Sequence, residues 1–235
     1  MKFLRLGIVL MVIVLIIALA GVSVGKLARH ESSPSRPAVP DAPAARFNTL
    51  ETQRFRLDAT QSKFIAHAMA GGLFWFKGHD HLVAVREFSG EAQFTPEQLN
   101  PASLEITARS GSMVETSSVF TDQQKQIIDK ELREIVLQPD QFPEITFRST
   151  QVEGRKSPSG DEYELKIAGN LTLHGVTRPI NIPAKISVSG NDLRAVGEFS
   201  IDRDDFNIKA TSAFHGLVRV RETIKFNFDI VGHRI

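Results

Sequence analysis

Two histidines, His79 and His81, have the spacing in this sequence that best suits a metal ion. Residues two apart on a strand face the same side, so both imidazoles could bind one ion, with Asp80 as a turn residue or as a hydrogen-bond partner of a histidine. The alternative is a solvated turn shaped by Gly78 and Asp80. A third ligand would have to come from another histidine, and the sequence offers His67, His174, His215 and His233.

Catalytic chemistry has little support in the residue pattern. Serine, aspartate and histidine occur, but no nucleophile-elbow, paired-carboxylate or metalloprotease spacing is present. The charged run 202–205 indicates an ion-paired strand end, and His174 a structural turn residue. Absence of cysteine excludes thiolate metal sites and a cysteine nucleophile. We therefore predict a non-enzyme without a cofactor, and keep a metal-binding or metal-dependent role of His79 and His81 as the alternative.

Phenylalanine is over-represented, with 16 copies against one Trp and one Tyr. Phe has no polar group that needs a partner, so the bias favours a dry interior, either a solid core or a lipid-lined cavity. Arg86 falls on the apolar face of its expected strand, where it would meet a lipid head group or bend to solvent at a rim. The residues concerned are Phe64, Phe74, Phe76, Arg86, Phe88, Phe94, Phe199, Phe226 and Phe228.

Short strands with alternating apolar and polar residues must position these side chains. Alternation is clearest at residues 162–189, where it breaks at 174–175 and resumes in a new phase, as in two half-buried strands joined by a turn. Residues 121–136 instead repeat apolar positions every three or four residues, with Thr121 and Gln124 as a capping box, which predicts one amphipathic helix. Further strands are expected at 54–59, 62–70, 82–94, 104–108, 141–150, 193–201 and 224–230.

The number of strands predicts an all-β fold. About eight or nine strands that each have one apolar face must bury those faces on one another, and closure into a barrel removes exposed edges. An eight-stranded barrel is just wide enough to be filled by side chains or to hold one small ligand. A two-sheet sandwich would give the same alternation. We predict an antiparallel barrel with one helix over residues 47–235.

The first 46 residues have a different character. Residues 6–24 carry no charge, and a helix of that length spans roughly 28 Å, about one hydrocarbon core. We predict a transmembrane signal-anchor over 1–25; the alternative is a signal peptide cut after Ala20. Prolines at three-residue spacing make 26–46 a semi-rigid linker. The domain is then anchored to the inner membrane and lies in the periplasm, or is periplasmic or secreted after cleavage.

Charge is unevenly divided along the chain. The net charge of +1 combines +4 on residues 1–46 with −3 on residues 47–235. A slightly acidic domain lacks the basic surface that nucleic acid requires, so nucleic acid is excluded as a partner. The sequence leaves the oligomeric state open, a homo-oligomer included.

Several blocks resemble one known family. Leu-Thr-Leu-His-Gly-Val-Thr-Arg-Pro at 171–179 is similar to the hairpin of the YceI-like, or polyisoprenoid-binding, family. Residues 88–94, 142–150 and 203–208 resemble further blocks in the same order, and the Gly78-His79 pair resembles one branch of the family. The helix departs from the pattern, with Lys-Glu-Leu-Arg-Glu at 130–134 where the family commonly has Lys-His-Leu-Arg-Ser.

The resemblance implies a lipocalin-like, eight-stranded antiparallel barrel with a helix laid across it. It also implies export to the bacterial periplasm and an elongated apolar cavity that binds a polyisoprenoid or quinone-like lipid without chemistry on it. Under this hypothesis the phenylalanines and Arg86 named above line the cavity, and the N-terminal helix is the contact with the membrane.

Overall fold

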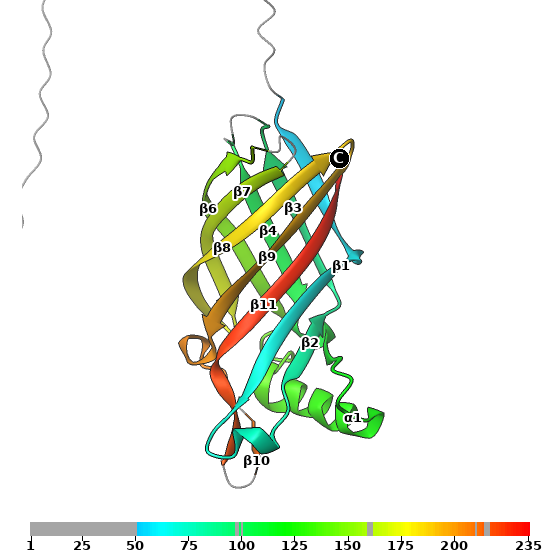
Figure 1. Ribbon diagram of the computed structural model, residues 1–235, viewed down its shortest axis with the longest axis vertical. Helices are drawn as coiled ribbons and strands as arrows, with labels where there is room; N and C mark the ends of the chain where they lie inside the picture. Colours follow the sequence, from blue (N-terminus) through cyan, green and yellow to red (C-terminus); the bar gives the residue numbers. More distant parts are fainter. Residues whose placement is uncertain (1–50, 97–98, 100, 159–161, 210, 214–216) are drawn as a thin grey trace, which may run out of the picture. The chain divides into compact units, whose positions relative to one another are not determined.

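One antiparallel sheet curls round and closes on itself in the computed structural model (Figure 1). The structure describes residues 51–235 except 97–98, 100, 159–161, 210 and 214–216. The predicted anchor or signal segment and the linker, residues 1–46, lie outside the described residues. Among those that are described, no helix is long and apolar enough to cross a membrane.

Eight strands form the closed wall, as predicted, and the pairing of β1 (Gln53–Gly71) with β11 (Val218–Arg234) closes it. Both hydrophobic clusters lie between residues 55 and 230, within the compact unit Phe47–Ile235. Three further strands extend the sheet, β2 (His81–Val85), β5 (Met113–Glu115) and β10 (Ser212–Ala213). In order round the barrel the wall strands are β1 (Gln53–Gly71), β11 (Val218–Arg234), β9 (Asp192–Asp202), β8 (Val176–Ser189), β7 (Glu162–Leu173), β6 (Glu144–Lys156), β4 (Ser103–Arg109) and β3 (Phe88–Phe94).

The prediction of two strands at 54–59 and 62–70 is wrong, because β1 spans both segments. It is one strand whose register against β11 shifts between Asp58 and Lys63. The Asp58 carboxylate accepts hydrogen bonds from the Thr60 backbone N–H at 2.8 Å and from the Thr60 hydroxyl at 2.6 Å. Hydrogen bonds from Thr60 and Gln61 hold the pKa of Asp58 below its usual range. A bulge closed by a side chain, rather than a turn, therefore interrupts the alternation.

The predicted strand 82–94 is also different, because it is broken into β2 and β3 at Arg86 and Glu87. The Glu87 backbone N–H donates to Ser112 Oγ at 3.0 Å, and its carbonyl accepts from the Arg109 N–H at 2.9 Å. The break changes the phase of the alternation, so that Val85 and Phe88, three apart, both face inward. Arg86 faces solvent.

The β7–β8 hairpin confirms the predicted turn. His174 and Gly175 have φ of 50° and 74°, the positive values that a two-residue type I′ turn requires. His174 Nε2 lies 2.9 Å from Gln138 Oε1, and its ring centroid is 4.2 Å from that of Phe142. His174 thus joins the hairpin to the segment after the helix, which is a structural role.

Helix α1 (Asp122–Glu131) begins after Thr121, whose capping box with Gln124 is present as predicted. It continues as the π-helical segment η3 (Leu132–Leu137) and ends at Gln138, in the left-handed region just before Pro139. Of the apolar residues that recur along this segment, Ile128, Leu132 and Val136 face the barrel, while Ile127 and Ile135 are exposed. The short 3-10 elements are η1 (Trp75–Lys77), η2 (Ser110–Ser112) and η4 (Arg203–Phe206).

Gly197 on β9 has no room for a side chain. A Cβ there would lie 2.6 Å from Phe228 Cζ and would also collide with the Pro183 carbonyl oxygen of β8. We expect Gly197→Ala to displace the Phe228 ring and lower the free energy of unfolding by about 1–3 kcal/mol in urea titrations. Gly111→Ala is the matched control, since its Cβ would meet Pro139 at an ordinary 3.4 Å. Equal stability of the two variants would contradict the prediction.

Candidate functional site

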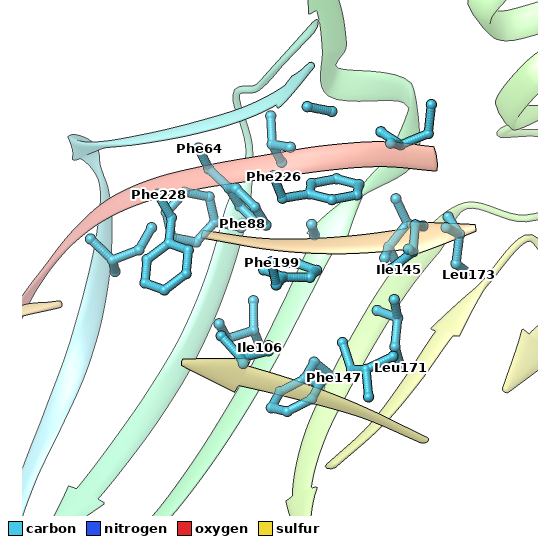
Figure 2. A pocket seen from close by; sticks show the side chains of 18 of the residues that line it. Phe64, Phe88, Ile106, Ile145, Phe147, Leu171, Leu173, Phe199, Phe226 and Phe228 are labelled. Atoms are coloured by element: carbon cyan, nitrogen blue, oxygen red, sulfur yellow. The ribbon is translucent and has the colours of Figure 1, made fainter. Parts of the chain in front are cut away.

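An elongated apolar cavity of about 250 Å³ occupies the barrel interior (Figure 2). Residues from the wall strands and the helix line it. Leu57 and Ala68 both contribute, and at ~3.3 Å of rise per residue they lie roughly 30 Å apart along β1, even with the bulge. A slot of this length with aliphatic and aromatic walls can hold a hydrocarbon chain out of water.

Six of the predicted phenylalanines line this cavity, namely Phe64, Phe88, Phe94, Phe199, Phe226 and Phe228. Most of them come together in one group of rings, as Figure 2 shows. The Phe199 and Phe226 rings stack at 4.9 Å with an interplanar angle of 8°, and Phe64 meets Phe88 edge-on at 6.2 Å. Strand alternation turns each of them inward, as the sequence indicated. Their contact with a ligand stays a prediction.

The other three predicted lining residues do not reach the cavity. Phe74 and Phe76 lie in the loop around η1, because Gly72, with φ of 88°, turns the chain out of the sheet where β1 ends. Of the two positions considered for Arg86, the structure has the solvent-facing one, since the break between β2 and β3 points both 86 and 87 outward. The expectation that these three residues face the interior is wrong.

The cavity is polar at one end. Its charged and ionisable lining residues gather where β1, β9 and α1 end and where β2 and β11 begin. We call this end the mouth. At the far end, Phe94 and Tyr163 meet edge-on at 4.8 Å, beside the fully buried Phe55, and the polar lining there is Gln93 and Ser103. The polar residues of the mouth are His81, Glu131, Arg203, Lys209 and Thr211.

Arg203 and Lys209 are the cations that the sequence reasoning missed. Arg203 Nη1 donates to the Ile208 carbonyl at 2.9 Å and pairs with Asp204 at 2.5 Å, while its buried Nε has no partner among the described residues. The signal was present: Phe199 and Ile201 face inward on β9, and one more step of the alternation reaches Arg203. The prediction of an ion-paired strand end at 202–205 is confirmed by the pair of Arg203 with Asp204, but it did not place Arg203 at the mouth.

A buried carboxylate, that of Glu115, holds His81 of the mouth in position. Glu115, whose side chain is 0% exposed, accepts hydrogen bonds from the backbone N–H groups of Leu82 at 3.1 Å and Ser117 at 2.7 Å and from His81 Nδ1 at 2.9 Å. Burial raises the pKa of Glu115, but these hydrogen bonds together outweigh it and hold the pKa below the usual value. The His81 ring stacks on Phe120 at 5.1 Å. His81 is therefore held in place by β5 and by the segment before α1.

The histidines expected to bind a metal are engaged elsewhere. His81 bonds Glu115, and His67 Nε2 lies 3.0 Å from Asp80 Oδ2. His79 is exposed and touches Phe120 edge-on at 5.8 Å. Within the described part of the chain, no three His, Asp or Glu residues are placed to share an ion. His215 lies outside the described residues, so the metal alternative has no described site to support it.

The barrel domain is similar in sequence to a known family of proteins. A model of the YceI-like domain matches residues 55–232. The UPF0312 protein of Yersinia pestis is 34% identical over 122 residues, which cover 52% of this chain and 54% of that protein. Protein YceI of Shigella flexneri is 35% identical over 145 residues, or 59% and 66% of the two chains. The chain thus spans about half the length of the Yersinia relatives it matches.

Solved structures show the same fold. The Burkholderia cenocepacia protein BcnA superposes with a TM-score of 0.57 at 19% identity, over 74% of this chain and 98% of BcnA. A polyisoprenoid binding domain from Saccharophagus degradans, implicated in plant cell wall breakdown, gives 0.54 at 12% identity, over 77% and 98%. The Campylobacter jejuni YCEI protein gives 0.50 at 18% identity, over 65% and 84%. At these identities the likeness is one of fold.

Proposed function

The chain belongs to the YceI-like domain family, and from that membership and the form of its interior we infer that it binds a long-chain isoprenoid lipid, a polyisoprenoid or a quinone-type lipid, without chemical change. The observation that carries the proposal is the cavity: a long apolar slot whose charged lining residues all lie at the mouth. The Saccharophagus relative is named for polyisoprenoid binding, which favours the same class of ligand.

Burial of hydrocarbon supplies the affinity in this proposal. Each methylene group that leaves water for the slot contributes about 0.8 kcal/mol, so a chain of a few isoprene units suffices for tight binding. The ring group around Phe199 and Phe226 gives the chain a flat apolar surface, and the polar residues of the mouth face the head group. In this proposal Arg203 and Lys209 contact the head group, which is the role that the sequence hypothesis gave to Arg86.

Binding without catalysis is the form of the proposal that fits the mouth best. Two of its ionisable groups have structural partners: His81 bonds Glu115, and Arg203 bonds Asp204 and a backbone carbonyl through Nη1. A general base or nucleophile needs a free atom directed at the reacting centre. We therefore assign His81 and Arg203 to shaping the mouth and contacting the head group.

The location follows from the sequence alone and remains part of the proposal. An uncharged segment at 6–24 followed by a proline-rich stretch suits a chain that is exported and then held at the inner membrane, or released if cut after Ala20. The domain then works in the periplasm, where a water-insoluble lipid needs a carrier.

The experiment is mass spectrometry of an organic-solvent extract of residues 47–235, exported and purified from the native host. We expect a long-chain isoprenoid lipid in near one-to-one ratio with protein, because a slot of this kind does not release its ligand readily into water. Protein stripped of lipid should take up an added quinone. A clean extract together with failure to take up quinone would show that the barrel is a solid core and would overturn the proposal.

A further inference from the structure

The loop between β1 and β2 exposes large apolar side chains. Leu73, Trp75 and Phe76 are 72%, 56% and 62% exposed. Single exposed apolar residues are ordinary, but here they gather within one short loop, next to the exposed Leu217 just before β11. Residues 72–78 and 217 are called the tip below. A contiguous patch of this kind marks an interaction surface.

Hydrogen bonds and ring contacts hold the tip in one conformation. The Phe74 backbone N–H donates to the Leu217 carbonyl at 2.9 Å, and the N–H of Gly78 donates to Trp75 at 3.0 Å. A Cβ on Gly72 would lie 2.6 Å from the Leu217 oxygen, so the two segments approach as closely as glycine allows. The Phe76 ring packs edge-on against Phe74 at 6.0 Å and Trp75 at 6.4 Å. Backbone geometry therefore holds the aromatic side chains outward.

Basic groups surround the tip. Arg219, Arg221 and Trp75 line a shallow surface hollow beside Gly71 and Gly72. Lys77 Nζ lies 5.9 Å from the centroid of the Phe74 ring, and Arg221 Nε donates to the Ala70 carbonyl at 2.9 Å. Two acids lie nearby: Glu222 lines the hollow, and Asp80 accepts from the Ala70 N–H and lies beside His67. The balance around the aromatic residues is positive.

The tip stands at the mouth of the cavity. Val220, between the two arginines, lines the cavity and pairs with Ala70 of β1, two residues before the tip begins. His81, just after the loop, also lines it. In Figure 1 this end of the barrel lies at the bottom, where β10 and α1 are drawn. Whatever enters or leaves through the mouth therefore passes beside the tip.

We propose that the tip docks on the surface of a bilayer containing anionic phospholipid. Trp75, Phe76 and Leu73 enter the interface, the depth at which amphipathic aromatic rings are most stable in membranes. Arg219 and Arg221 receive a lipid phosphate in the hollow, and Lys77 adds attraction to the negative surface. Docking would bring the mouth against the membrane, so that a lipid exchanges without crossing water. The inference is linked to the proposed ligand but does not require it.

A second copy of this chain fits the tip poorly. A two-fold contact would bring the same patch of both copies together and set Lys77 and the two arginines against their own counterparts. Like charges placed together across an interface oppose association by several kcal/mol. An anionic lipid surface offers apolar depth and negative charge at once, which is the complement that the tip requires.

Trp75 allows a direct test, because it is the single tryptophan of the chain. Residues 47–235 are mixed with vesicles of phosphatidylcholine, with or without phosphatidylglycerol, and followed by tryptophan emission and by co-sedimentation. We expect a blue shift and sedimentation with the anionic vesicles, both weakened by salt. Phe76→Ser with Leu73→Ser should reduce vesicle binding at least about tenfold while Trp75 still reports. Arg219→Gln with Arg221→Gln should remove the preference for phosphatidylglycerol.

Ile235→Ser is the matched control, since Ile235 is exposed at the opposite end of the barrel and should leave vesicle binding unchanged. Absence of a blue shift with anionic vesicles, or binding that the tip variants do not weaken, would overturn the proposal. A blue shift of the tryptophan emission that depends on protein concentration in the absence of vesicles would assign the tip to contact with a second copy. That outcome would also overturn the proposal. Vesicle binding by protein whose extract contains no lipid would support docking even if the proposed ligand is wrong.

Discussion

Ala195→Phe is expected to reduce the affinity for a long-chain lipid by about 100-fold or more while the barrel stays folded. Ala195 lies on β9 between Ile230 and Ile186, and its side chain faces the cavity, where it is only half-buried because it borders open space. An added ring would displace about four methylene groups of the ligand. At about 0.8 kcal/mol each, that loss is roughly 3 kcal/mol, which corresponds to the stated change in affinity.

The control places the same ring on the other face of the wall. Ala168 of β7 alternates with the inward-facing Ile167 and is not part of the cavity lining, so Ala168→Phe should bind lipid as the wild type does. Affinities are compared by titration of lipid-free protein with a quinone, and folding by thermal unfolding. Wild-type affinity in a folded Ala195→Phe variant would place the ligand outside this cavity.

Glu115→Ala is expected to lower the free energy of unfolding by about 3–5 kcal/mol, because each buried donor left without an acceptor costs about 1–3 kcal/mol. The substitution leaves the backbone N–H groups of Leu82 and Ser117 without their acceptor in a region closed to water. His81 also loses its partner. Glu115→Gln keeps one acceptor oxygen and should cost less, about 1–2 kcal/mol, in urea titrations.

The same residue gives a pH dependence with a definite sign. The pKa of Glu115 is lower in the folded than in the unfolded chain, so its ionised form stabilises the fold. That contribution is complete above the unfolded value of about 4.3 and is lost as the pH falls through the folded value. The difference in the free energy of unfolding between the wild type and Glu115→Gln should therefore shrink as the pH falls. A difference between the two that does not change with pH would contradict this assignment.

The barrel, the helix and most of the cavity wall could be predicted because each depends on local periodicity. The β7–β8 hairpin has unbroken alternation and a His-Gly turn, and the helix begins at a capping box that is four residues long. Phe199, Phe226 and Phe228 follow the same rule on β9 and β11. For these residues one strand alone determines the direction of the side chain.

The errors arise where a contact between distant segments interrupts the pattern. Arg86 faces out because Ser112 and Arg109, on other elements, bind Glu87 and break the strand. Phe76 stays outside because Gly72 packs on Leu217, far along the chain. No short window of sequence contains both partners of these contacts, so periodicity could not reveal them. Arg203 is different, because the alternation of β9 itself leads inward to it.

Closure of the wall by its first and last strands determines when the fold can be completed. Phe55 pairs with Arg234, so nearly the whole chain must be synthesised before the two edges meet. Until then β1 presents an unpaired edge to any other strand. Pairing between residues so distant in sequence is slow, so the chain stays open and exposed to aggregation until its last strand is available. Loss of the last strand, Val218–Arg234, would leave an open sheet with two free edges rather than a shorter barrel.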